Sequence, residues 1–63
     1  MNYIAFVLYK QKLKHLTFWE AQRLMIDVAM LPNPRLVAAM GRAVQVVKPE
    51  LYWWYKRLVR EMA

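Results

Sequence analysis

The stretch TFWEAQRLMIDVAMLPNP, residues 17–34, contains one complete helix and the beginning of the next. Thr17 followed three residues later by Glu20 is a capping box, in which each side chain accepts a hydrogen bond from the other residue's backbone N–H. The Pro-Asn-Pro run at 32–34 ends this helix and begins a second one, because Asn is a favoured N-cap and Pro a favoured first helical residue. A helix, a short turn and another helix predict an all-α fold.

Working outward from this stretch, we expect a compact bundle of three to four short helices in a single domain, residues 1–63. The expected helices are about 3–15, 18–31, 34–47 and 49–62. The second is apolar around most of its circumference, so we expect it to be the central, most buried helix. Sixty per cent of the residues are hydrophobic. One core of this size cannot hide so much apolar surface, and dimerisation could complete the bundle.

The segment 3–15 fits two structures. Apolar residues at 6, 9, 13 and 16 have the spacing of a helix face, whereas the lysines at 10, 12 and 14 alternate as in a strand. We predict a helix, because the chain offers no second strand to pair with it. A strand paired across a dimer is the alternative.

The last segment, PELYWWYKRLVREMA at 49–63, has two different faces. On a helical wheel the apolar residues share one side, which we expect to face the core. These residues are Leu51, Tyr52, Trp54, Tyr55, Leu58, Val59 and Met62. The opposite side carries Trp53 among Lys56, Arg57 and Arg60. Since a solvated face rarely carries a tryptophan among three cations, this side is predicted to bind a partner.

Composition excludes several kinds of site. Serine and cysteine are absent, and the one threonine serves as a helix cap, so no nucleophile–base arrangement can be assembled. A single histidine, His15, cannot build a zinc site alone. No glycine-rich loop is present to hold a phosphate. We therefore expect a protein that is not an enzyme, with no cofactor, no metal and no small-molecule substrate.

The net charge of +6, from ten Lys and Arg against four Asp and Glu, favours acidic partners. Our first hypothesis is a binding protein that docks on a larger protein or forms a homodimer, as an inhibitor, adaptor, accessory subunit or phage-like regulator. Trp53 and Trp54 would be its anchors, with Arg57 and Arg60 pairing acidic groups at the rim. The lack of cysteine and of a signal-peptide-like start indicates a cytoplasmic location.

Nucleic acid is the alternative partner. Residues 36–60 resemble a helix-turn-helix, in which the second helix would enter the major groove and Lys and Arg would contact phosphates. Cations outside the last helix complete the predicted binding set: Arg35, Arg42, Lys48, Lys10, Lys12 and Lys14. A membrane surface ranks third, since an amphipathic helix rich in aromatic and basic residues can lie at a bilayer interface.

Overall fold

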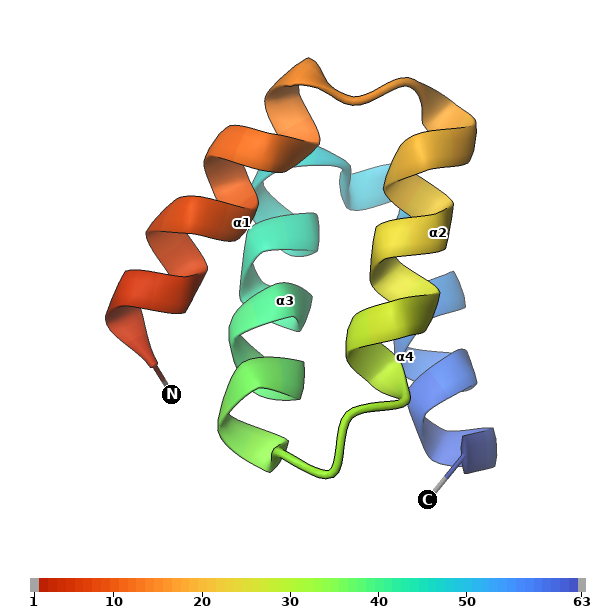
Figure 1. Cartoon of the computed structure of the whole chain (residues 1–63). Helices are drawn as coiled ribbons and strands as arrows, with labels where there is room; N and C mark the ends of the chain where they lie inside the picture. Colours follow the sequence, from red (N-terminus) through yellow and green to blue (C-terminus); the bar gives the residue numbers. More distant parts are fainter. Residues whose placement is uncertain (1, 63) are drawn as a thin grey trace.

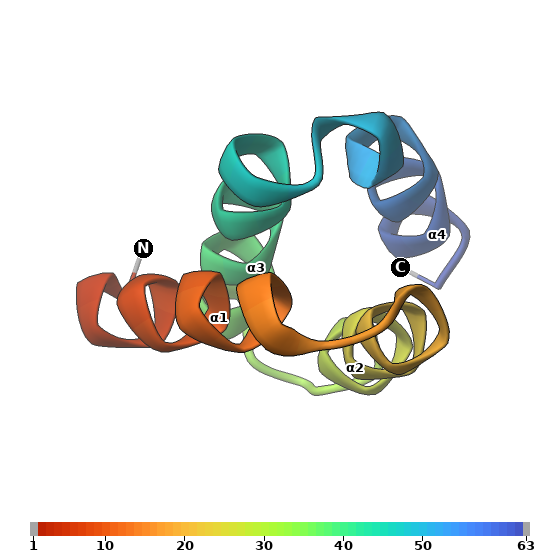
Figure 2. The same ribbon diagram turned by 90° about the horizontal axis from the view of Figure 1, so that it is seen from above.

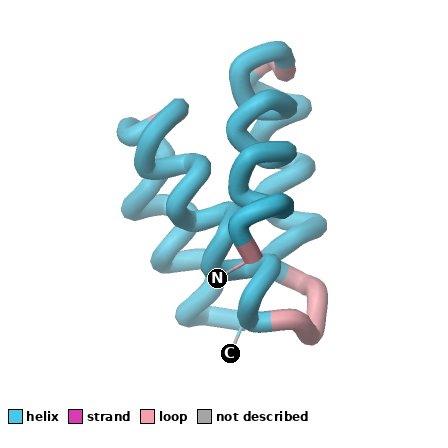
Figure 3. The backbone as a smooth tube through the Cα atoms, turned by 90° about the vertical axis from the view of Figure 1, so that its left-hand side faces the viewer, coloured by secondary structure: helices cyan, strands magenta, loops and turns pink. Residues whose placement is uncertain are grey.

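The computed structural model describes residues 2–62, and all regular structure within that range is helical. The elements in chain order are α1 (Tyr3–His15), α2 (Phe18–Ala29), α3 (Pro34–Val47), the 3₁₀ turn η1 (Pro49–Leu51) and α4 (Tyr52–Met62). The predicted all-α fold is confirmed, and the strand alternative for 3–15 is wrong. Loops are short and lie at the helix ends (Figure 3).

Consecutive helices run in opposite directions, up, down, up and down in Figure 1. Seen from above, α2, α3 and α4 stand side by side, while α1 lies inclined across α3 and its first turns project sideways (Figure 2). Helix α3 contacts α1, α2, α4 and η1, whereas α1 packs chiefly on α3. The molecule is therefore a four-helix arrangement built around α3.

The expectation that the second helix would be central is wrong, because α3 takes that place. The size of its side chains is consistent with this place: Ala39, Gly41 and Ala43 are small and buried, and the Tyr55 ring lies against Gly41. Helix α2 buries only one face and leaves Trp19 77% exposed. The number of hydrophobic residues in a helix was therefore a poorer guide to which helix is central than the presence of small residues at its contacts.

Helix ends follow the local sequence. Thr17 N–H donates to Glu20 Oε1 at 2.9 Å and Glu20 N–H donates to Thr17 Oγ1 at 3.3 Å, which confirms the capping box. Asn33 Oδ1 accepts from two backbone N–H groups at the start of α3, as expected. Asn2 caps α1 with a single bond, in which its Oδ1 accepts from the Ala5 N–H at 3.1 Å, and we did not predict this cap. Helix α2 ends at Ala29 rather than at residue 31, since the chain already turns ahead of the proline.

The core is formed by all four helices around Leu13, Met25, Met40, Val44 and Tyr55, which are almost completely buried. The predicted apolar side of the last segment mostly faces this core, and its first residues form η1 before α4 begins. The last member of that side does not: the Met62 side chain is 44% exposed. It lies in the last turn of the helix, where less of the bundle is present to cover it.

Thr17→Ala is expected to lower the free energy of unfolding by about 1 kcal/mol, because the Glu20 N–H loses the hydroxyl that accepts its hydrogen bond. Urea denaturation followed by circular dichroism measures this loss. A change within error of zero would mean that water replaces the cap at no cost.

The other half of this capping box should make stability depend on pH. The hydrogen bond from the Thr17 N–H holds the pKa of the Glu20 carboxyl below its ordinary value of 4.5. The carboxylate therefore stabilises the fold above the unfolded pKa, and this contribution is lost as pH falls through the folded pKa. The difference in the free energy of unfolding between wild type and Glu20→Gln should therefore become smaller as the pH is lowered from neutral to acidic.

Candidate binding groove between α3 and α4

A surface groove of 390 Å³ runs between α3 and α4. Its α3 wall consists of Pro34, Val37, Ala38, Gly41 and Arg42, and its α4 wall of Tyr52, Tyr55, Lys56 and Val59. Both walls follow the i, i+3, i+4, i+7 spacing of one helix face. The groove therefore extends along both helix axes for about two turns, roughly 10 Å at 1.5 Å per residue. We call it the α3/α4 groove.

Two features keep the floor of the groove open. Gly41 has no side chain, and a Cβ at that position would lie in ordinary van der Waals contact with the Tyr55 ring, at 3.5 Å. The Tyr55 ring is held in place, because its hydroxyl donates to the Val37 carbonyl oxygen at 3.0 Å. Burial raises the pKa of the Tyr55 phenol well above its ordinary value, so the hydroxyl keeps its proton. The groove is thus a fixed feature of the α3–α4 contact.

Two cations from different helices border this apolar floor. Arg42 and Lys56 line the groove from α3 and α4, and no acidic residue lines it. Within residues 2–62 neither side chain forms an ion pair, and both are exposed. Lys56 Nζ lies 5.8 Å from the centre of the Tyr52 ring, which keeps the ammonium over the groove wall. The groove is therefore apolar inside and positive at its edges.

Trp53 lies beside the groove and not in the core. Its side chain is 73% exposed and packs edge-on against Tyr52, with 5.4 Å between ring centres. Helix α4 has no substantial contact with α1, so the N-terminal helix does not cover this ring. Trp53 adds exposed aromatic surface next to Tyr52, which itself lines the groove.

The remaining predicted residues of α4 are placed differently. Arg57 and Arg60 are exposed, and Arg57 Nε lies 3.7 Å from Glu61 Oε1. Trp54 is half-buried and packs against the core cluster. Trp54 therefore has less surface to offer a partner than Trp53.

The predicted cations outside α4 do not form one patch. Arg35 is exposed in the first turn of α3, away from the groove lining, and Lys48 is the half-buried residue between α3 and η1. Lys10 Nζ lies 4.8 Å from the centre of the Phe6 ring. Lys12 and Lys14 lie in the last turn of α1, where positive charge suits the helix dipole. Of this set, only Arg42 lines the groove, together with Lys56 of α4.

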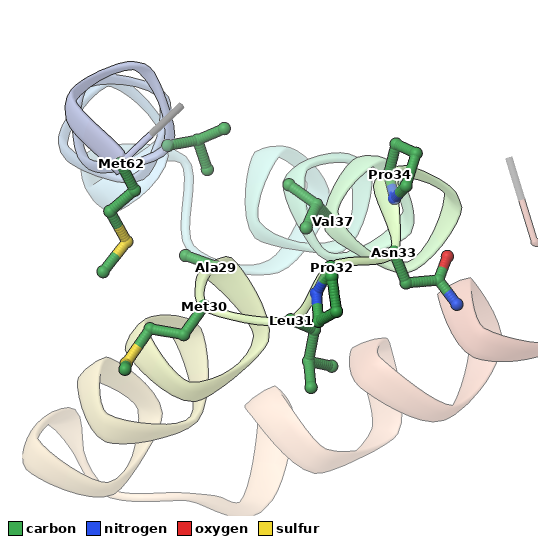
Figure 4. Close-up of a pocket in the computed structure, with 9 residues that line it drawn as sticks. Ala29, Met30, Leu31, Pro32, Asn33, Pro34, Val37 and Met62 are labelled. Carbon is green, nitrogen blue, oxygen red and sulfur yellow. The ribbon is translucent and has the colours of Figure 1, made fainter.

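A second groove, of 580 Å³, adjoins the first at the end of the bundle where α2 and α4 end (Figure 4). It is lined by Ala29, Met30, Leu31, Pro32, Asn33, Pro34, Val37, Val59 and Met62. Pro34, Val37 and Val59 belong to both grooves. Because its lining carries no charged residue, this end groove extends the apolar surface without adding electrostatic selectivity.

The apolar lining of the α3/α4 groove was missed by sequence reasoning, which selected cations and tryptophans. One signal was present: Ala38 and Gly41, one turn apart, are small. Such small residues leave room beside a helix, and Ala38 is indeed exposed and borders the groove.

The described residues 2–62 contain no group of three or more His, Cys, Asp or Glu side chains that could hold a metal ion. Over the same range, none of the helices combines the length and the apolar character needed to cross a bilayer. No known family model, curated protein or solved structure matches this chain. The surface chemistry of the protein is therefore the guide to its function.

Proposed function

We propose that this protein is a stoichiometric, non-enzymatic binding protein that docks on an acidic surface of a larger protein through the α3/α4 groove. The observation that carries the proposal is the pairing of an apolar floor with two cations, Arg42 and Lys56, that have no ion-pair partner within residues 2–62. Apolar contacts would supply affinity, while the cations would select acidic partners and speed association. Trp53 would add an aromatic contact at the edge.

The alternative partner, nucleic acid, is less well supported by the arrangement of α3 and α4. A helix-turn-helix crosses its two helices steeply, so that the second can enter the major groove. Here α3 and α4 run antiparallel and side by side (Figures 1 and 2). The start of α4 also presents Tyr52 and Trp53 where polar groups would contact base edges.

We also propose that the protein acts in the cytoplasm.

A charge-reversal experiment tests the proposed function. Tagged wild-type protein is compared with Arg42→Glu/Lys56→Glu and with a charge-matched control, Lys12→Glu/Lys14→Glu, whose two exposed residues lie in the last turn of α1 and do not line the groove. Proteins retained from cells are identified, purified and rebound. We expect one partner to bind wild type and control but not the groove variant, at both ~50 and ~200 mM salt.

Two outcomes would contradict the proposal. Equal loss in both charge-reversed variants would mean that overall charge, and not the groove, attracts the partner. Retention that disappears after nuclease treatment would identify nucleic acid as the partner. Circular dichroism on each variant shows that the helices are intact.

A further inference from the structure

We infer that the occupant of the α3/α4 groove is a single amphipathic helix of the partner protein, apolar on one face and acidic on its flanks. This inference rests on the proposed function and specifies the chemistry of the ligand. Three properties of the groove lead to it: its shape, the size of the residues at its base, and the distribution of charge along its edges.

The shape of the groove favours a rod-like occupant. Both walls follow a helix face for about two turns, so the walls are nearly parallel to each other and open to solvent. An amphipathic helix laid into such a groove makes contacts at i, i+3, i+4 and i+7, the spacing that the walls themselves have. An extended strand would need an exposed sheet edge for its backbone, and the described residues 2–62 contain no strand.

Small residues permit the close approach that a third helix requires. Packed helices have axes 8–10 Å apart, and the shorter distances need small side chains at the contact. On the α3 wall, Ala38 and Gly41 are one turn apart, and Ala38 is exposed. Large side chains of the occupant could therefore fill the space above them, against Tyr52 and Val59.

The two cations at the edges of the groove favour an occupant with acidic residues on its flanks. Arg42 stands on one wall and Lys56 on the other, so acidic residues on both sides of the apolar face would each meet a cation. A basic helix would meet the same cations and be repelled. Toward Pro34 and Val59 the groove continues into the uncharged end groove, where the occupant needs only apolar residues.

Synthetic peptides test the inference directly. Each has about 16 residues, long enough for partial helicity in water. The acidic peptide carries Leu along one face with Glu flanks; the basic peptide replaces each Glu with Lys; the scrambled peptide keeps the acidic composition without an apolar face. Fluorescence anisotropy should show the acidic peptide binding at least about tenfold more tightly than the other two.

The groove variant should invert this preference. Arg42→Glu/Lys56→Glu is expected to bind the basic peptide more tightly than the acidic one, whereas Lys12→Glu/Lys14→Glu keeps the wild-type order. The site of binding can be read from one signal, because Gly41 is the only glycine in the chain. Its amide resonance, seen alone after glycine-selective ¹⁵N labelling, should shift with the acidic peptide and not with the scrambled one.

Several results would overturn the inference. Equal binding of acidic and scrambled peptides would mean nonspecific attraction, and an unmoved Gly41 signal would place the peptide elsewhere. If sedimentation of the protein alone shows dimers, and Arg42→Glu/Lys56→Glu dissociates them, the occupant is a second copy of this chain.

Two further results separate the inference from the proposed function. If none of the peptides binds while binding of the partner protein still depends on Arg42 and Lys56, the helical occupant is wrong and the proposed function stands. If the acidic peptide binds in the groove but Arg42→Glu/Lys56→Glu retains the partner protein as well as wild type does, the proposed function is wrong.

Discussion

Ala38→Trp is expected to abolish binding of the acidic helical peptide while leaving the fold intact. Ala38 is exposed on α3, so an indole at this position displaces no core side chain. A tryptophan side chain carries roughly 150–250 Å² of surface, and an indole on the α3 wall would stand in the groove where the occupant has to lie. The occupant would lose the burial of about two large apolar anchors, or ~3 kcal/mol, equivalent to an affinity loss of about 100-fold.

The matched control for this obstruction is Gln11→Trp. Gln11 is exposed on α1 and does not line the α3/α4 groove, so the control adds the same aromatic surface elsewhere. Fluorescence anisotropy with the acidic peptide compares the two variants, and circular dichroism checks their helicity. Wild-type affinity in Ala38→Trp would show that the peptide does not occupy this groove.

Tyr55→Ala is expected to unfold the protein. Its ring is 2% exposed and packs in the core between α3 and α4. Removing a buried aromatic side chain costs about 3–5 kcal/mol. One hydrophobic core in a domain this small rarely supplies more than about 3–5 kcal/mol in total. Far-ultraviolet circular dichroism should show loss of helix at room temperature; a cooperative thermal transition near that of wild type would contradict the prediction.

Tyr55→Phe separates the ring from its hydrogen bond. The ring keeps its packing, but the Val37 carbonyl loses the hydroxyl that donates to it at 3.0 Å. We expect a loss of about 1–2 kcal/mol in the free energy of unfolding, measured in urea. A loss as large as that of Tyr55→Ala would mean that the hydrogen bond, and not packing, holds α4 in place.

The same hydroxyl gives the fold an alkaline limit. Burial raises the folded pKa of Tyr55 above its ordinary value of 10.0. Folding then favours the protonated phenol: this contribution is complete below the unfolded pKa and is lost as pH rises toward the folded one. Wild type should lose stability above about pH 10 more steeply than Tyr55→Phe.

Local signals explain why so much of the fold was predictable. The Thr17–Glu20 capping box, the Asn33-Pro34 start and the apolar stripes act within a few residues of each other, so each can be read without knowing the rest of the chain. Three of these predictions failed at the edges: α2 ends at Ala29, α4 begins after a 3₁₀ turn, and Met62 is exposed. The first two concern the conformation of one or two residues at a helix end, and the exposure of Met62 depends on how far the rest of the bundle covers the last turn of α4.

The candidate site was predicted only in part. A helical wheel is sufficient to place Trp53 opposite the core face of its own helix, and the exposed ring agrees with that placement. The wheel cannot show that Arg42 and Lys56 border one groove, since they belong to different helices. The wheel did place Trp54 on the core-facing side, where its ring packs, whereas the binding hypothesis had used this residue as an anchor.

By itself, the sequence determined the all-α fold, the N-terminal caps of α2 and α3, and the side of the last segment that mostly faces the core. These properties follow from hydrogen bonds and amphipathic spacing inside a single segment. Only the tertiary structure decided that α3 is central and that α3 and α4 together form the groove. The amphipathic pattern of a helix predicts which of its faces is buried, but it does not predict which other helix packs against that face. That choice depends on the sizes of all the side chains packed together, and small residues such as Gly41 and Ala38 show their effect only once a neighbour is in place.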